Sequence, residues 1–237
     1  MNGLRAQLAE LRALSDALAR RPAAGRVGVC PPATLIHRAA EVLSGSRVDL
    51  GAQDCRAEAA GAFTGDLSAE MLADAGARLV ILGHSERRRG HGESNTLIAG
   101  KVAASLRAGL EPIICVGERL EERRAGETRT VVLAQVRGSL PIELARRAFM
   151  IAYEPVWAIG SGLTPSLAEI EEAHAAIRGE LLARLGSEGE RAPILYGGSV
   201  KPGNAAAVLA VAEVGGALVG GASLKASDFL GIIHPES

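Results

Sequence analysis

Apolar residues follow two patterns that alternate along the chain. Over residues 1–20, leucines recur three or four positions apart, which places them on one face of a helix. After this stretch, short apolar and β-branched runs alternate with helical patterns. Seven strands are predicted, at residues 27–30, 48–52, 79–82, 112–116, 149–153, 194–196 and 217–219. Seven further helices are predicted, at residues 33–43, 68–75, 96–108, 128–140, 166–185, 204–212 and 223–232.

This alternation of strands and helices predicts an α/β fold. Strands joined through helices run parallel with right-handed crossovers, and their sheet is buried on both faces. Such a sheet either closes into a barrel or opens into a doubly wound sheet, and periodicity alone does not choose between them. Since no Pro/Ser-rich linker or charge block divides residues 1–237, a single domain is predicted.

Composition and charge exclude several classes of protein. The chain has 26 Lys and Arg against 27 Asp and Glu, so nothing favours binding to nucleic acid or to an anionic membrane. With 48% hydrophobic residues it has material for a sizeable core, and no apolar run approaches the roughly 18 residues that span a bilayer. No secretory signal is predicted from residues 1–20, and three cysteines without metal-ligand spacing suit a reducing cytoplasm. Cys115 lies in an apolar run and is predicted to be a buried thiol.

Candidate functional residues lie directly after the predicted strands, which is where parallel α/β folds have their active sites. Gly83-His84-Ser85-Glu86-Arg87 follows residues 79–82, and a segment beginning at Glu154 follows residues 149–153. Two glycine-rich turns, Gly197-Gly198-Ser199-Val200 and Gly220-Gly221-Ala222-Ser223, follow the last two strands. One carboxylate, one imidazole and two flexible turns are therefore predicted on one face.

Each feature has a functional and an ordinary interpretation. A partly buried Glu154 suits a general base, although a lone glutamate more often caps a strand or pairs with arginine. An isolated His84 is more often structural, but the two residues on one rim favour acid–base chemistry. Glycine turns that open toward helices suit a phosphate, and otherwise simply make tight turns. Residues 154–162, with a proline, a tryptophan and two glycines, suit either a hinged lid or an ordinary loop.

At these residues the chain resembles the triosephosphate isomerase family. Six stretches appear in the family's order over nearly the whole length: Gly51-Ala52-Gln53-Asp54, Gly61-Ala62-Phe63-Thr64-Gly65-Asp66, Leu82-Gly83-His84-Ser85-Glu86-Arg87-Arg88, Ala152-Tyr153-Glu154-Pro155-Val156-Trp157-Ala158-Ile159-Gly160, Tyr196-Gly197-Gly198-Ser199-Val200 and Leu218-Val219-Gly220-Gly221-Ala222-Ser223-Leu224. The resemblance implies a (β/α)8 TIM barrel that interconverts dihydroxyacetone phosphate and glyceraldehyde 3-phosphate through an enediolate, with no metal or organic cofactor.

The resemblance also implies a role for individual residues. Glu154 would be the base, His84 the neutral electrophile that polarises the carbonyl, and Glu86 a supporting residue beside them. Thr64 lies in a loop that reaches into a partner subunit in the family, so a homodimer is implied. The substrate phosphate would be held by backbone N–H groups of Gly160, Ser199, Gly220 and Gly221.

The chain departs from the family at its start. The family's first strand ends in Asn-Trp-Lys before Met-Asn-Gly, whereas this sequence begins at Met1-Asn2-Gly3, so a barrel lacking strand 1, with seven strands and eight helices, is predicted. None of the lysines in this chain matches the position of the lysine in the family's Asn-Trp-Lys run. The strands near residues 27 and 217 are expected to have unpaired edges. Gly215 stands where an Asp is common in the family, and Leu163 where many members have Lys; both departures are expected to be tolerated. The three lysines are Lys101, Lys201 and Lys225.

Several functional hypotheses follow. The chain is predicted to be an isomerase by lineage but slow or inactive as written, since losing one preorganised oxyanion donor costs about 3 to 4 kcal/mol. A variant of this hypothesis is that the true protein extends upstream of Met1. A second hypothesis is a non-catalytic phosphate-binding or interaction barrel. A third, another phosphate-handling barrel isomerase, does not account for the Gly-His-Ser-Glu-Arg and Glu-Pro-Val-Trp runs.

Overall fold

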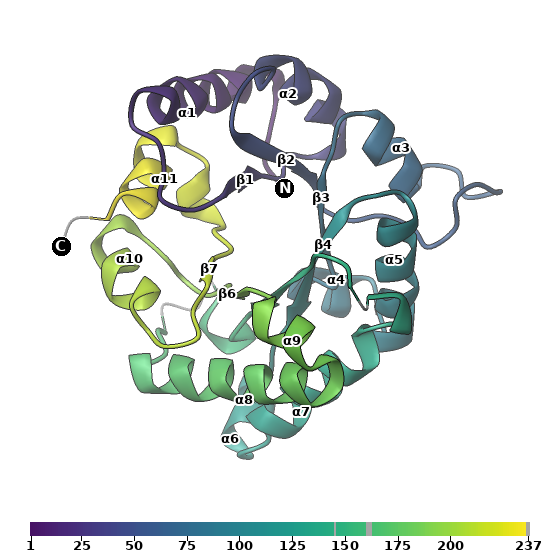
Figure 1. The fold of residues 1–237 in the computed structure, drawn as a ribbon, viewed down its shortest axis with the longest axis vertical. Helices are drawn as coiled ribbons and strands as arrows, with labels where there is room; N and C mark the ends of the chain where they lie inside the picture. The colour runs from purple at the N-terminus through teal and green to yellow at the C-terminus, as the bar shows by residue number, and fades with distance from the viewer. Residues whose placement is uncertain (145, 160–162, 236–237) are drawn as a thin grey trace.

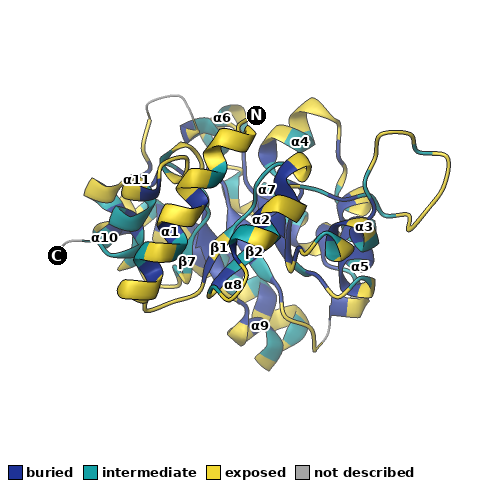
Figure 2. Ribbon diagram, turned by 90° about the horizontal axis from the view of Figure 1, so that it is seen from above, coloured by how far each residue is buried: buried dark blue, intermediate teal, exposed yellow. Residues whose placement is uncertain are grey.

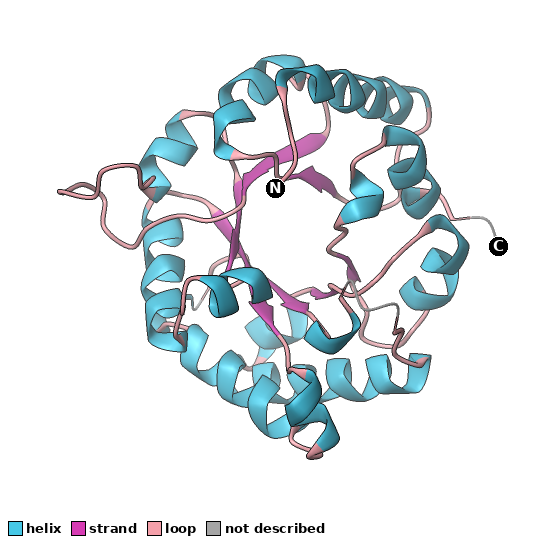
Figure 3. Ribbon diagram, turned by 180° about the vertical axis from the view of Figure 1, so that it is seen from behind, coloured by secondary structure: helices cyan, strands magenta, loops and turns pink. Residues whose placement is uncertain are grey.

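The computed structural model describes residues 1–144, 146–159 and 163–235 and contains one parallel sheet surrounded by helices. Figures 1 and 3 show the strands as an inner ring and the helices as an outer ring. The strands pair in chain order, each parallel to the next. Their bounds are β1 (Val27–Val29), β2 (Val48–Ala52), β3 (Leu79–Leu82), β4 (Glu111–Val116), β5 (Met150–Tyr153), β6 (Ile194–Tyr196) and β7 (Gly216–Ala217).

All eight predicted helices are present. They are α1 (Leu8–Arg20), α2 (Ile36–Val42), α3 (Ala69–Asp74), α5 (Asn95–Arg107), α7 (Thr128–Ser139), α8 (Leu167–Leu185), α10 (Pro202–Leu209) and α11 (Ala226–Ile233). Three short helices were not predicted: α4 (Ser85–Gly90), α6 (Leu120–Arg124) and α9 (Ser187–Arg191). Single 3₁₀ turns lie at η1 (Arg5–Gln7), η2 (Ala33–Leu35), η3 (Ile142–Leu144), η4 (Val156–Ala158) and η5 (Gly221–Ser223).

Side chains alternate between two apolar layers, as expected for strands covered on both faces. On β3, Val80 and Leu82 face the helices, and Ile81 lies in the inner cluster. That inner cluster fills the middle of the ring with Ile113, Cys115, Ala152 and Leu195. The strands β2 to β6 are mostly buried, whereas β7 is only partly buried (Figure 2). Cys115 is completely buried, which confirms the prediction for this thiol.

The ring of strands is open between β7 and β1. In the described residues β1 pairs only with β2 and β7 only with β6, which confirms the predicted unpaired edges. The outer ring nevertheless closes across this seam, because α1 packs against α11. There the Ala226 N–H donates to the Glu10 carboxylate at 2.9 Å, and Nε2 of His234 lies 3.2 Å from the carbonyl oxygen of Arg21.

The last strand is shorter than predicted. Residues 217–219 were expected to be extended, but β7 covers Gly216–Ala217. The Leu218 N–H still donates to the carbonyl of Tyr196 at 2.9 Å, and Tyr196 is the last residue of β6. Val219 has no strand to pair with, because β6 has ended and the other edge of β7 is open. In the described part of the chain, no helix has the length and apolar character that a membrane span requires.

Candidate active site

The predicted carboxylate and imidazole meet at the carboxyl ends of the strands. Glu154 directly follows β5, and its N–H donates to the carbonyl of Val116 at 2.7 Å, one residue beyond the β4–β5 pairing. Its carboxylate is almost fully buried, and its Oε1 lies 2.9 Å from Nε2 of His84. The sequence therefore predicted correctly that these two residues share one rim.

Ser85 holds the same carboxylate. Its backbone N–H donates to Oε2 of Glu154 at 2.9 Å, and its hydroxyl donates to Oε1 at 3.1 Å. Ser85 is the first residue of α4, so the carboxylate also lies at a helix N-terminus, where negative charge is favoured. Sequence reasoning gave Ser85 no role, although it lies inside the Gly83–Arg87 motif. With these donors Glu154 has a fixed orientation.

His84 is the N-cap of α4, which determines its tautomer. Nδ1 of His84 accepts from the N–H of Glu86 at 3.3 Å, so the ring proton of the neutral form is on Nε2, facing Glu154. Burial acts to lower the pKa of His84, but the hydrogen bond and charge of Glu154 outweigh it and the pKa is raised. Contact with Glu154 therefore favours the charged imidazolium, whereas the neutral ring carries its proton on Nε2.

Two glycines make room for Glu154. A Cβ on Gly117 would collide with the carbonyl oxygen of Glu154, and a Cβ on Gly197 would lie 2.9 Å from its Cγ. Gly197 was predicted as part of a phosphate-binding turn, and its contact with the base was not foreseen. Gly117 comes directly after β4. It therefore lies at the carboxyl end of a parallel strand, the same kind of position that made Glu154 a candidate.

Glu118 is a buried carboxylate on the far side of the Glu154 segment. Its Oε1 accepts from the Trp157 indole N–H at 2.8 Å and from the Tyr153 hydroxyl at 3.2 Å. Its backbone carbonyl accepts from the Val156 N–H at 3.1 Å. Glu118 therefore anchors residues on both sides of Glu154. Glu118 is the second residue after β4, a strand end at which no candidate residue was predicted.

Two cations, the half-buried Arg88 and the buried Lys101, make hydrogen bonds and ion pairs near the strand ends. Arg88 donates to the carbonyls of Gly83 and Cys115, each at 2.9 Å, and so ties the ends of β3 and β4 together. Lys101 pairs with Asp54 at 2.7 Å and with Glu93 at 2.6 Å, away from Glu154. Lys101 is thus part of a structural ion network, consistent with its exclusion as a substrate-binding lysine.

The glycine turns after β6 and β7 present free backbone donors. Among the described residues, the N–H groups of Ser199, Gly220 and Gly221 have no hydrogen-bond acceptor within the chain. Gly220 and Gly221 lead into the turn η5, and Ser199 precedes α10. An anion could accept all of these hydrogen bonds. Gly160, predicted as a fourth donor, lies outside the described residues, as does part of the predicted lid.

Two other predicted residues lie apart from this cluster. Glu86 is exposed on α4, and its carboxylate makes no hydrogen bond or ion pair in the described part of the chain. Its negative charge contributes to the raised pKa of His84, after the larger effects of burial and Glu154. Thr64 is exposed on the loop between β2 and α3, which projects from the barrel in Figures 1 and 2.

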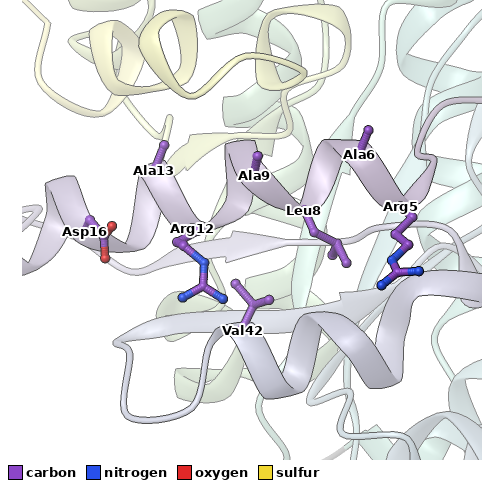
Figure 4. Close-up of a pocket in the computed structure, with 8 residues that line it drawn as sticks. All are labelled: Arg5, Ala6, Leu8, Ala9, Arg12, Ala13, Asp16 and Val42. Carbon is purple, nitrogen blue, oxygen red and sulfur yellow. The ribbon is translucent and has the colours of Figure 1, made fainter.

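A groove of about 540 Å³ lies on the outer surface, away from these residues. Figure 4 shows Leu8 and Arg12 of α1 on the side that faces Val42 of α2, with Arg5 of η1 further along the groove. None of the strand ends contributes to its lining. The residues suited to catalysis and binding are therefore those of the rim, which is formed by Glu154, His84 and the glycine turns.

Comparisons with known proteins agree with this fold. The family model described as triosephosphate isomerase matches residues 1–236. A triosephosphate isomerase of Caulobacter vibrioides is 58% identical over 99% of this chain and 92% of its own length. One of Ruegeria pomeroyi is 56% identical over 98% of this chain and 92% of its length. The crystal structure of triosephosphate isomerase from Bartonella henselae superposes with a TM-score of 0.92 at 45% identity, covering 100% of this chain and 96% of the other.

Proposed function

The chain belongs to the triosephosphate isomerase family, and we propose that it interconverts dihydroxyacetone phosphate and glyceraldehyde 3-phosphate with Glu154 as base and His84 as electrophile. The observation that carries this assignment is the 2.9 Å contact between Glu154 and His84, at the same end of the strands as backbone N–H groups that have no acceptor among the described residues. The fold and the isomerase activity follow from the family.

Glu154 moves the proton between the two carbons. Its carboxylate removes a proton from C1 of dihydroxyacetone phosphate, and the resulting enediolate is protonated at C2 by the same group. The Nε2–H of His84 is donated to the oxygen on C2, while the hydroxyl on C1 gives up its proton as the aldehyde forms. Among the carbons, C1 loses one proton and C2 gains one. Among the oxygens, the one on C2 gains a proton and the hydroxyl on C1 loses one, so the reaction needs no external oxidant or reductant.

Separation of the two side chains prepares His84 for this step. Substrate must come between His84 and Glu154, which removes the contact that raises the pKa of the imidazole. Burial and the N-terminus of α4 remain, and both favour the neutral ring. A neutral imidazole that donates through Nε2 is suited to polarise a carbonyl without losing its proton to solvent.

Backbone donors bind the phosphate in this proposal. The N–H groups of Ser199, Gly220 and Gly221 have no acceptor in the described part of the chain and lie at the same end of the strands as Glu154. We assign the same role to Gly160, on the resemblance alone. Glu86, exposed near His84, acts through its charge. The reaction is proposed to use neither a metal nor an organic cofactor.

The assembly and location of the protein are further proposals. The loop that carries Thr64 suits insertion into a second copy, because it projects from the barrel and has an ordered base. Arg56 donates its N–H to Leu67 at 2.8 Å and stacks on Phe63 at 3.6 Å. We propose a homodimer on this support. One sheet from β1 to β7 supports a single domain, and three free cysteines support a cytoplasmic location.

Residues 1–237 are proposed to turn substrate over slowly. No Lys or Arg side chain contacts the carboxylate of Glu154 or the turns at Ser199 and Gly220 in the described residues. The seam between β7 and β1 also leaves the rim incompletely supported. A rate equal to that of ordinary members of the family would contradict this part of the proposal.

A coupled isomerase assay tests the function. Glu154→Gln is expected to reduce kcat by roughly 100- to 10,000-fold, because general-base catalysis contributes that much. His84→Asn is expected to reduce kcat while leaving binding of inorganic phosphate intact. Glu127→Gln, an exposed change outside the site, serves as the matched control. Phosphate binding without any turnover in the unmodified chain would instead favour a non-catalytic phosphate-binding barrel.

A further inference from the structure

Arg123 lies between the two flanks of the segment that follows Glu154. It belongs to α6, and its guanidinium carbon lies 5.0 Å from the centre of the Trp157 ring. The same guanidinium forms an ion pair with Glu169 in the first turn of α8. Trp157 lies three residues after Glu154, whereas α8 begins where the connecting segment ends. A single side chain therefore contacts two anchors, which are Trp157 and the first turn of α8.

The Trp157 anchor is already tied to the base. The Trp157 indole and the Tyr153 hydroxyl donate to the same oxygen of Glu118, at 2.8 and 3.2 Å. Tyr153 and Trp157 flank Glu154 in the chain, so their positions determine how Glu154 enters the site. Arg123 covers the ring face of Trp157, and its Nη1 lies 3.9 Å from Oε1 of Glu118.

The other anchor is equally well defined. Ser166 is the N-cap of α8, and its N–H and hydroxyl both reach Oε2 of Glu169, at 2.7 and 2.9 Å. Glu169 therefore holds the start of α8 with one oxygen and Arg123 with the other. These bonds form a chain from Ser166 through Glu169 and Arg123 to Trp157.

An arginine suits this place better than a lysine. The planar guanidinium stacks on an aromatic face and forks toward carboxylates at the same time, which an ammonium cannot do. Glu118 is fully buried, and one of its oxygens has no partner in the described residues. Burial raises the pKa of Glu118, and the hydrogen bond from Trp157 and the charge of Arg123 act in the opposite direction.

We propose that Arg123 is a positioning residue that fixes Trp157 relative to the N-terminus of α8 and thereby sets the direction from which Glu154 faces the substrate. The proposal rests on the role of Glu154 proposed above. Among the described residues, Arg123 touches none of the predicted phosphate donors at Ser199, Gly220 and Gly221, so we expect its effect on the chemical step and not on phosphate binding.

Arg123→Met tests the proposal, because it removes the guanidinium and keeps most of the stem. We expect kcat to fall roughly 10- to 100-fold, as for a misplaced catalytic group, with KM within about twofold of the original. Trp157 is the only tryptophan, so its emission reports this anchor alone and should shift to longer wavelength. Arg124→Met is the matched control, because Arg124 is exposed in the same helix. Arg123→Lys should restore part of kcat by keeping the ion pair with Glu169.

Further variants distinguish the possible outcomes. If Glu169 acts through Arg123, the double variant R123M/E169Q loses no more kcat than R123M alone. Equal kcat and equal emission in R123M and R124M overturn the proposal, and so does a rise in KM with kcat unchanged. If the unmodified chain has no turnover, the proposed function fails separately. Trp157 emission and amide exchange over residues 150–158 then decide the role of Arg123, and unchanged values overturn it.

Discussion

At the scale of single residues, His174 makes the stability of the folded protein depend on pH. It is fully buried on α8, with Nδ1 3.2 Å from the carbonyl oxygen of Glu213 and no partner for Nε2 in the described residues. Its ring lies edge-on to Tyr153 at 5.8 Å, directly behind the strand end that carries Glu154. Burial lowers its pKa to about 4, so it is neutral in the folded protein at neutral pH.

This lowered pKa predicts acid sensitivity. Between the unfolded value near 6.5 and the folded value, the unfolded chain binds more protons, so stability falls as the pH falls. His174 alone should cost about 2 kcal/mol of unfolding free energy between about pH 7 and pH 5. Urea unfolding at both pH values measures this cost. His174→Asn should remove most of the difference, whereas the exposed His37→Asn should not. An unchanged pH dependence in His174→Asn would refute the assignment.

At the scale of elements, the two helices after the glycine turns begin at lysines. Lys201 is the N-cap of α10 and Lys225 the N-cap of α11, where the positive end of the helix dipole makes a cation unfavourable. Both turns have N–H groups without an acceptor among the described residues, at Ser199 and at Gly220 and Gly221. Positive charge at this place therefore lowers the stability of the helices and favours an anion beside them.

Replacing one of these lysines should separate the two effects. Lys225→Ser introduces a favoured N-cap and removes the cation, so the free energy of unfolding should rise by about 0.5 to 1 kcal/mol. The same change should weaken binding of inorganic phosphate, and the loss should shrink at high salt. Denaturant unfolding and phosphate titration on one preparation measure both quantities. A variant that is less stable and binds phosphate equally well would contradict the argument.

The elements themselves were largely predictable, and the exceptions have local causes. Strands buried on both faces read as apolar runs, which is why β2, β3 and β6 match their predicted bounds. Three short helices carry too few residues for a periodic pattern, and α4 nevertheless places Ser85 against Glu154. Contacts such as Gly197 with Glu154, or Arg123 with Trp157, join distant segments, so no local pattern could indicate them.

At the scale of the whole molecule, the sheet has two edges where a closed barrel would have none. β4 is hydrogen-bonded to β3 on one side and β5 on the other, whereas β1 and β7 each have one neighbour. The helices α1 and α11 join outside the seam, so the outer layer remains continuous. Local opening should therefore begin at the strands on either side of the seam, while β4 opens only with the whole domain.

Hydrogen exchange tests this gradient directly. Amides in β1 and β7 should exchange at least roughly tenfold faster than those in β4, because their outer groups face no neighbouring strand. The measurement should be repeated at two protein concentrations, since an unpaired edge is also a template for another chain. Edge amides that gain protection with concentration would mean that a second copy pairs at the seam. Edge protection equal to that of β4 at every concentration would mean that the sheet closes on itself, contrary to the open seam seen here.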